Sequence, residues 1–450
     1  MVNQRSPVGA IQAGNGAEST VQSSDGAAEA AGRVSRYRYF VLLILTITYT
    51  VSLIDRQLIA IMIEPVRRDL HLSDTQIGLL SGLAFGLFYA LAAIPLSRIA
   101  DSWSKSRLIA GCLCLWSIAT AVCGLAGSFV HIFIARVIIG ASEGGASSTS
   151  QALLADHFPP RQRATALGVY AVGVHVGAGL SLVLGGLSVH ILGWRQTFLI
   201  LGIPGIILAL VLFLTLHDVH DHRRSSVRDA LPGFTTSLRI VAARPVLLLT
   251  ACGYGLSILA SQALLNWFPA YMMRYYGLSA REVGLRMGLV AAASGAIGVA
   301  LGGKLADILA RKRPANRAHV AAGAIIAAVP MGVLSVSGLS EQQAFVWFGA
   351  YVFVAGFVAG PAFAIVQNVA PPALRSLAAA VASATTVVIG QAVGPFAPGF
   401  LSDIMARFDV AQPLRAALIA VISCSAAGAI VFLGVAASIQ RDEERSSGQR

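Results

Sequence analysis

Residues 97–101 read Ser-Arg-Ile-Ala-Asp, and residues 303–307, which begin 206 positions further on, read Gly-Lys-Leu-Ala-Asp. A basic cluster follows each segment. A second pair repeats in the same order, with Pro-Pro-Arg-Gln-Arg at 159–163 and Pro-Pro-Ala-Leu-Arg at 371–375. The alternative, that any polar loop between apolar runs collects Arg and Pro, does not account for the shared Ala-Asp or for the common order. The two echoes therefore predict a duplicated unit.

Long apolar runs surround these segments and have the length of membrane helices. A bilayer core of ~30 Å requires about 20 helical residues. Twelve runs meet this length, and they lie at 39–63, 75–99, 107–129, 131–157, 164–191, 195–216, 245–273, 281–308, 317–338, 342–369, 375–402 and 413–438. A polar linker at 217–244 divides them six and six. We therefore predict an all-α membrane protein in which two pseudo-symmetric six-helix bundles, 33–216 and 245–440, lie between tails at 1–32 and 441–450. The Ala-, Gly- and Ser-rich composition of residues 1–32 predicts a disordered tail.

Composition excludes several classes of protein. Of the 450 residues, 56% are hydrophobic and 12% are charged, against about 25% charged in soluble domains. A water-soluble enzyme and a disordered chain are both incompatible with this balance. The five cysteines all lie inside apolar runs, so neither a disulfide framework nor a metal site is indicated.

The basic residues predict the orientation in the membrane. With the N-terminus in the cytoplasm, 23 of the 33 Lys and Arg lie in cytoplasmic segments, eight lie outside, and Arg56 and Arg136 lie inside helices. The positive-inside rule therefore predicts that both termini are cytoplasmic. The formal charge of +12 reflects this bias, so no nucleic-acid partner is expected. Richness in Ala, Gly and Arg favours a bacterial inner (plasma) membrane.

The echoed loops resemble the signature loop of the major facilitator superfamily, Gly-x-Leu-Ala-Asp-Arg-x-Gly-Arg-Arg, although Ser97, Ser102 and Ser104 depart from it. The run 131–157 is similar to the Arg-x-x-x-Gly-x-x-x-Gly pattern of that family, with Arg136, Gly140 and Gly144. The resemblance extends over nearly the whole chain. It implies two six-helix bundles around a central cavity, alternating access, and a cytoplasmic gate formed by Asp101, Lys105, Arg107, Asp307, Arg311 and Arg313.

A more specific resemblance is to the Spinster branch of that superfamily. It rests on Asp55-Arg56 within the first run, Glu64-Pro65 at its end, Leu-Ser-Asp-Thr-Gln-Ile-Gly-Leu-Leu at 72–80, and Glu143 in the fourth run. Known members of the branch move sphingoid phosphates and lysophospholipids. The resemblance therefore implies an amphipathic solute.

Four charges lie inside the first and fourth runs: Asp55, Arg56, Arg136 and Glu143. Each costs at least ~2.5–3.5 kcal/mol to insert. At ~1.5 Å per residue, Asp55 lies ~13 Å from the outer end of its run, between Arg136 at ~8 Å and Glu143 at ~18 Å. We therefore expect a proton-coupling network in which Glu143 is the main proton carrier, Asp55 is a second one, and the two arginines are their switching partners. Static bridges that join the first and fourth helices are the alternative.

The second half of the chain carries almost no charge inside its helices. We expect a cavity with one ionisable wall and one apolar to amide-like wall, lined by aromatic and amide side chains at Phe85, Phe88, Tyr89, Tyr254, Gln262, Asn266, Trp267, Phe363, Gln367, Asn368 and Gln391. Each aromatic residue taken alone more often faces lipid or the helix core than a cavity. Such a cavity fits an amphipath better than a sugar.

The sequence thus predicts a monomeric, multi-pass secondary transporter of a small amphipathic solute, with the proton as coupling ion and no other cofactor. A multidrug/proton antiporter and an organic-anion/proton symporter are the alternatives within transport. A non-transporting membrane receptor is a third, although no loop between the runs exceeds about 30 residues. A primary pump is not expected, because the sequence contains no Gly-x-x-x-x-Gly-Lys-Ser/Thr loop.

Overall fold

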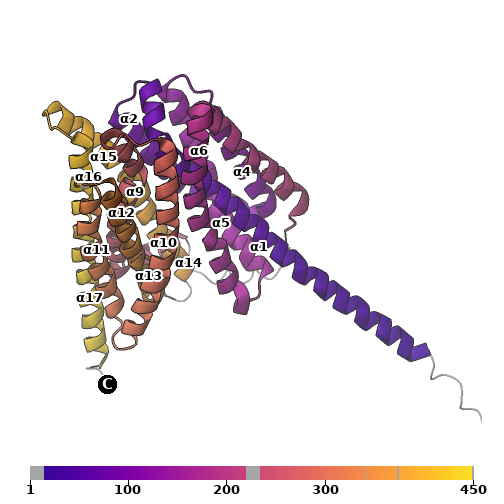
Figure 1. Cartoon of the computed structure of the whole chain (residues 1–450). Coiled ribbons are helices and arrows are strands. Elements are labelled where there is room, and N and C mark those ends of the chain that lie inside the picture. Colours follow the sequence, from indigo (N-terminus) through magenta and orange to yellow (C-terminus); the bar gives the residue numbers. More distant parts are fainter. Residues whose placement is uncertain (1–14, 219–233, 339, 372–373, 448–450) are drawn as a thin grey trace, which may run out of the picture.

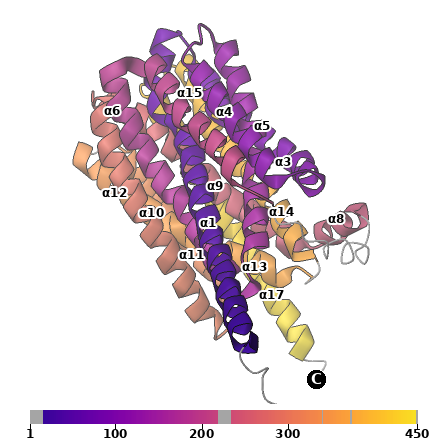
Figure 2. The same ribbon diagram turned by 90° about the vertical axis from the view of Figure 1, so that its right-hand side faces the viewer.

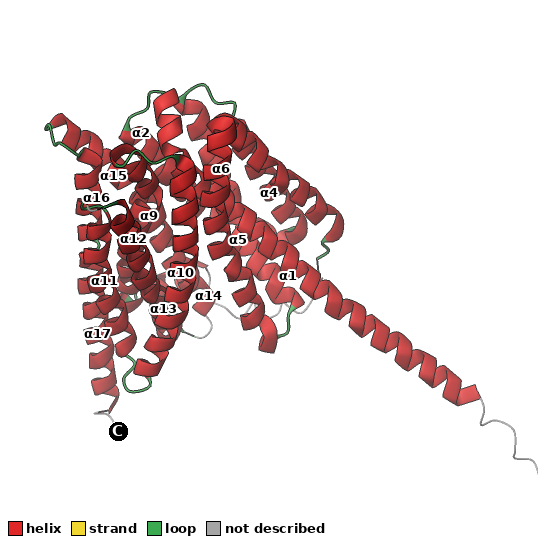
Figure 3. Cartoon of the chain, viewed as in Figure 1, coloured by secondary structure: helices red, strands yellow, loops and turns green. Residues whose placement is uncertain are grey.

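The chain is almost wholly helical in a computed structural model that describes residues 15–218, 234–338, 340–371 and 374–447 (Figure 3). No strand occurs within these ranges. The helices, of which η1 and η5 are π-helices and η3 is a 3₁₀ helix, are α1 (Asn15–Asp69), α2 (Asp74–Gly78), η1 (Leu79–Leu83), α3 (Ala84–Ser102), α4 (Lys105–Cys123), α5 (Phe129–His157), α6 (Pro160–Thr215), α8 (Phe234–Ala242), α9 (Pro245–Tyr275), α10 (Ala280–Ala310), α11 (Asn316–Ser335), α12 (Glu341–Ala355), η3 (Gly356–Val358), α13 (Ala359–Val369), α14 (Arg375–Thr386), η5 (Val387–Ala392), α15 (Val393–Arg407), α16 (Pro413–Cys424) and α17 (Ala426–Ser447).

Eleven continuous helical stretches within the described residues are long and apolar enough to cross a membrane. The longest, Thr165–Thr215, has 51 residues. At ~1.5 Å per residue such a length is more than twice the thickness of a ~30 Å bilayer core. Gly193 interrupts it with φ 78°, a conformation that a residue with a Cβ rarely adopts. The stretch therefore crosses twice, which gives the twelve crossings that the sequence predicts.

The N-terminal tail and the linker differ from the expectation. Residues 15–32 continue α1 as a helix, whereas the sequence predicts disorder there, and residues 1–14 lie outside the described residues. Adding turns to an existing helix is much easier than nucleating one, so the membrane segment can extend backward through an Ala-rich sequence. Part of the linker forms the short helix α8.

Matching helix starts in the two halves support the duplication. Ser73 accepts a hydrogen bond from the backbone N–H of Gln76, and the Gln76 side chain accepts one from the Ser73 N–H. Ser279 and Glu282 form the same capping box at the start of α10. These serines are 206 positions apart, the same offset as the echoed loops. A capping box satisfies two backbone donors that the helix itself cannot satisfy, so both halves begin their second membrane helix in the same way.

Glycine allows equivalent helices in the two halves to touch backbone to backbone. A Cβ on Gly140 of α5 would lie 2.3 Å from the Phe85 carbonyl oxygen of α3. A Cβ on Gly298 of α10 would lie 2.1 Å from the Phe353 carbonyl oxygen of α12. Membrane helices associate closely through small residues in this manner. The second and fourth membrane helices of each half therefore pack together through the same kind of glycine contact.

The two halves meet through close contacts near one end of the molecule. A Cβ on Gly284 of α10 would lie 2.3 Å from the Leu182 oxygen of α6, and one on Gly82 of η1 would lie 2.3 Å from the Ala392 oxygen of η5. Figure 2 shows α6 beside α10. In Figure 1 the ribbons of the two halves diverge from this region. We call the end at which α1, α9 and α15 terminate the closed end, and the end at which α3 and α10 terminate the opposite end.

Gly140→Ala is expected to destabilise the protein by ~1–3 kcal/mol, because the new methyl group overpacks a backbone contact. Gly111→Ala is the matched control, because a Cβ there meets nothing within 4 Å and alanine favours helix by up to ~1 kcal/mol. Thermal unfolding of the purified proteins in detergent measures both effects. Equal shifts of the melting temperature in the two variants would show that the contact of Gly140 with the Phe85 backbone does not restrict packing.

Candidate functional site

An ion pair between Arg56 of α1 and Glu143 of α5 lies in the middle of the N-terminal half. Arg56 Nη2 is 2.7 Å and Nε 3.2 Å from Glu143 Oε2. The hydroxyl of Ser52, one turn before Arg56, donates to the same oxygen at 3.0 Å. The Glu143 side chain is 1% exposed and that of Arg56 11%. A buried, charge-assisted pair of this kind is strongly bonded but depends on both partners remaining in place.

Arg56 also connects the two halves of the molecule. Its Nη1 donates to Gln391 Oε1 in η5 at 3.4 Å. Its guanidinium carbon lies 4.7 Å from the ring centre of Phe85 and 5.1 Å from that of Tyr89, distances typical of cation–π contacts. One side chain therefore contacts a carboxylate, an amide and two aromatic rings on three different elements.

Asp55 and Arg136 do not join this ion pair. Asp55 is 2% exposed, and neither of its carboxylate oxygens has a hydrogen-bond partner among the described residues. The indole N–H of Trp116 is the neighbouring donor, and it lies outside standard hydrogen-bond geometry. Arg136 donates from Nε to the Leu80 carbonyl oxygen at 3.1 Å. The four charges that the sequence places at a shared depth thus form one ion pair and two separate buried groups.

The aromatic and amide residues expected to line the cavity fall into different environments. Trp267 is fully buried and donates from Nε1 to the Pro395 oxygen at 2.7 Å. Asn266 is 3% exposed and donates to the Gln262 oxygen at 2.9 Å. Trp267 thus packs α9 against α15, whereas the Asn266 bond lies within α9. Tyr254 and Phe363 pack edge to face with ring centres 5.7 Å apart. Phe85 is buried. The remaining predicted cavity residues are partly or more fully exposed, namely Phe88, Tyr89, Tyr254, Gln262, Phe363, Gln367, Asn368 and Gln391.

Two of the residues expected to form a gate at the opposite end, Lys105 and Asp307, pair within their own half. Lys105 Nζ lies 2.5 Å from Asp156 Oδ2 in the N-terminal half. Asp307 pairs with Arg317 at 3.0 Å in the C-terminal half. The side chain of Asp101 lies outside the described residues. Arg107, Arg311 and Arg313 are exposed.

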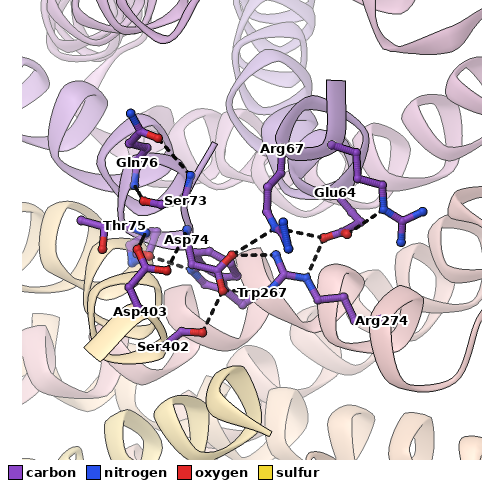
Figure 4. A network of polar contacts seen from close by, with 12 residues as sticks. Glu64, Arg67, Ser73, Asp74, Thr75, Gln76, Trp267, Arg274, Ser402 and Asp403 are labelled. Carbon is purple, nitrogen blue, oxygen red and sulfur yellow. Dashed lines mark hydrogen bonds and ion pairs between the residues drawn. The ribbon is translucent and has the colours of Figure 1, made fainter. Parts of the chain in front are cut away.

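A second charged cluster at the closed end is absent from the sequence prediction of site residues (Figure 4). It brings together Glu64 of α1, Asp74 of α2, Arg274 of α9, and Ser402 and Asp403 of α15. Glu64 and Asp74 lie in segments that carry the Spinster resemblance. Arg274 is one of the eight basic residues predicted on the outer side. Acids at two neighbouring helix ends, with few basic residues on that side, are the signal that could have identified the cluster.

Two cavities flank this cluster. One, of about 740 Å³, is lined by Glu64, Arg68, His190 and Ser279 among others. The other, of about 230 Å³, is lined by Arg67, Asp74, Arg274 and Asp403 among others. Open space therefore adjoins the carboxylates and arginines of the ion pairs that join the halves.

Comparison with known proteins identifies the family. Residues 45–395 match the sequence profile of the Major Facilitator Superfamily. The chain belongs to this superfamily. It is 31% identical over 408 residues to an MFS-type efflux pump of Mycolicibacterium smegmatis (89% of this chain and 92% of that protein). It is 26% identical over 279 residues to the hexuronate transporter of Bacillus subtilis (60% of this chain and 65% of that protein).

A solved structure supports the Spinster resemblance. The crystal structure of a bacterial homologue of the human lysosomal transporter Spinster, in an inward-facing and unoccupied conformation, matches with a TM-score of 0.80 and 26% identity. The match covers 90% of this chain and 98% of that one. The protein is therefore a multi-pass membrane transporter related to Spinster, and not an enzyme.

Arg56→Gln is expected to destabilise the protein by ~3–5 kcal/mol, because it leaves Glu143 buried without a cation. The double variant Arg56→Gln/Glu143→Gln should be more stable than Arg56→Gln alone, because no charge is then left unpaired. Arg195→Gln is the control. Arg195 forms an exposed pair with Asp69 at 2.6 Å and donates one hydrogen bond to the Ala126 oxygen at 3.1 Å, and because exposed pairs contribute only ~0–1 kcal/mol, its loss of stability should be smaller than that of Arg56→Gln. Melting temperatures in detergent rank the variants, and a double variant less stable than the single one would contradict the expectation.

Proposed function

We propose that this protein is a proton-coupled secondary active transporter that moves a small amphipathic organic solute by alternating access. The observation that carries the proposal is the buried Arg56–Glu143 pair, from which Arg56 reaches Gln391 of the other half. A rearrangement of the halves would move Gln391 relative to Arg56 and so disturb the pair. A carboxylate that loses its cation in a dry environment is stabilised by taking up a proton.

The two buried carboxyl groups have different roles in this proposal. Glu143 accepts hydrogen bonds from Arg56 and Ser52, which favours its ionised form. Asp55 is equally buried but has no hydrogen-bond partner among the described residues, and a dry, unpartnered carboxylate is costly. We therefore assign Glu143, whose cation a rearrangement would displace, as the main proton carrier and the buried Asp55 as the second.

The solute follows from the two walls of the predicted cavity. In this proposal Arg56 and Tyr89 form the wall of the N-terminal half, and Gln391 and the Tyr254–Phe363 pair form the wall of the C-terminal half. A cation beside an amide suits a polar or anionic head group, and aromatic rings suit an apolar body. A lysolipid-like solute has both parts. The similarity to a Spinster homologue also supports it.

Two alternatives within transport stay open. The identity to an MFS-type efflux pump favours a multidrug/proton antiporter. The more limited identity to a hexuronate transporter favours an organic-anion/proton symporter. In each case the protein acts as a monomer in a bacterial inner membrane with both termini in the cytoplasm, so that the closed end faces outward.

Glu143→Gln is expected to abolish pH-driven transport in proteoliposomes, because an amide cannot take up and release a proton. Asp55→Asn should also uncouple transport, while exchange of solute without a pH gradient persists in both variants. Asp409→Asn is the matched control, because Asp409 is an exposed acid with φ 53°, a conformation that Asn also tolerates. Undiminished coupling in Glu143→Gln would remove Glu143 from the mechanism.

A thermal-shift screen tests the class of solute. We expect lysolipids or sphingoid phosphates to raise the melting temperature of the purified protein, because a ligand that binds only the folded state stabilises it. Cationic drugs, hexuronates and neutral sugars are the comparison ligands, each measured at two pH values. Stabilisation by hexuronates or sugars alone would overturn the amphipath assignment.

A further inference from the structure

At the closed end, one arginine of the C-terminal half holds two carboxylates of the N-terminal half. Arg274 Nε donates to Glu64 Oε2 at 2.6 Å. Its two terminal nitrogens donate to the two oxygens of Asp74, both at 2.8 Å. The three side chains are 14%, 5% and 9% exposed in that order. The planar guanidinium fork suits this three-bond geometry.

Two residues of α15, in the C-terminal half, also form hydrogen bonds with the start of α2. Asp403 accepts hydrogen bonds from the backbone N–H groups of Asp74 at 3.2 Å and Thr75 at 2.8 Å. The Ser402 hydroxyl donates to Asp74 Oδ2 at 2.7 Å. These backbone N–H groups lie in the first turn of α2, where no preceding carbonyl of the helix can accept them. Their exposure to water therefore reports separation of the halves.

Two arginines of the N-terminal half lie beside the same carboxylates. Arg68 Nε donates to Glu64 Oε1 at 2.8 Å. Arg67 Nε is 3.3 Å from Asp74 Oδ1 and 3.8 Å from Glu64 Oε2. This nitrogen of Arg67 is buried, yet it makes no hydrogen bond in the part of the chain that the structure describes. Asp74 thus already has a second cation at ion-pair distance, and the Nε donor of that cation makes no hydrogen bond while Arg274 is bound.

We propose that Glu64, Asp74, Arg274 and Arg67 form an exchange latch. In this latch Arg274 holds the closed end shut, and Arg67 takes over Asp74 when the halves separate. The proposal rests on the alternating access of the proposed function. Arg68 keeps Glu64 paired throughout, so neither acid is left without a cation when Arg274 withdraws. Burying an unpaired charge is strongly unfavourable, and the exchange lowers this cost in the open form. The two cavities that adjoin the cluster provide space for the movement.

The latch makes predictions of opposite sign for the two arginines. Arg274→Gln removes the cation that joins the halves, so the closed end should open more often. Arg67→Gln removes the cation that stabilises the open form, so the closed end should open less often. A purely structural role for Arg67 would give no change or the same direction as Arg274→Gln. The direction in which Arg67→Gln changes the opening of the closed end is therefore the decisive observation.

Hydrogen–deuterium exchange of the full chain in detergent measures the opening. We expect exchange in the peptide that contains Asp74 and Thr75 to become roughly tenfold faster in Arg274→Gln, as loss of charge-assisted bonds implies. It should become slower in Arg67→Gln. Arg195→Gln, which removes an ion pair within one half at the same end, should leave it unchanged.

The outcomes separate the latch from the transport mechanism. Faster exchange in Arg67→Gln, or equal exchange in Arg274→Gln and Arg195→Gln, would overturn the latch. Because Arg67 makes no hydrogen bond through Nε, its replacement should still fold and decides the question even if Arg274→Gln does not fold. Failure of Glu143→Gln to uncouple transport would contradict the proposed function, whereas the exchange experiment does not depend on proton coupling.

Discussion

The absence of water from the bilayer core controls where this protein places its charges. A charge in that layer must find a partner within the protein or become neutral. The chain meets this constraint with one central ion pair, Arg56–Glu143, and one cluster at the closed end around Arg274. Both sites involve side chains from the two halves. The electrostatic energy of the interior therefore depends on how the halves are arranged, which is the property that a transporter with two conformations requires.

Glycine supplies the complementary constraint, because it fixes where the halves can touch. The approaches at Gly82 and Gly284 bring backbones together near the closed end, and side chains of ordinary size could not fit there. Within each half, equivalent contacts at Gly140 and Gly298 keep the second and fourth helices together. Each half is thus tightly packed in itself and is joined to the other half over part of its length. At the opposite end, the described ion pairs stay within one half, as Lys105 with Asp156 illustrates.

The sequence predicts the fold well because membrane helices leave long apolar runs, and the twelve crossings follow those runs. It brings out Arg56 and Glu143 because isolated charges in such runs are conspicuous. It fails where the outcome depends on the direction in which a side chain points in the tertiary structure. The fully buried side chain of Trp267 looks like a cavity residue in the sequence, because periodicity does not tell which face of a helix meets a neighbour. The bond of Arg136 to a backbone carbonyl has no sequence signature, since any residue supplies the acceptor. The cluster around Arg274 joins residues about 200 positions apart, beyond the reach of local patterns.

The capping serines, 206 positions apart, define equivalent positions in the two halves. Arg68 and Arg274 each precede their capping serine by five positions, so they occupy the same place in the repeat. Each binds one oxygen of Glu64. The counterpart of Glu64 in the second half is Ala270. One carboxylate is therefore shared by two arginines at equivalent positions, so the pseudo-symmetry of the chain ends in a contact that favours one direction.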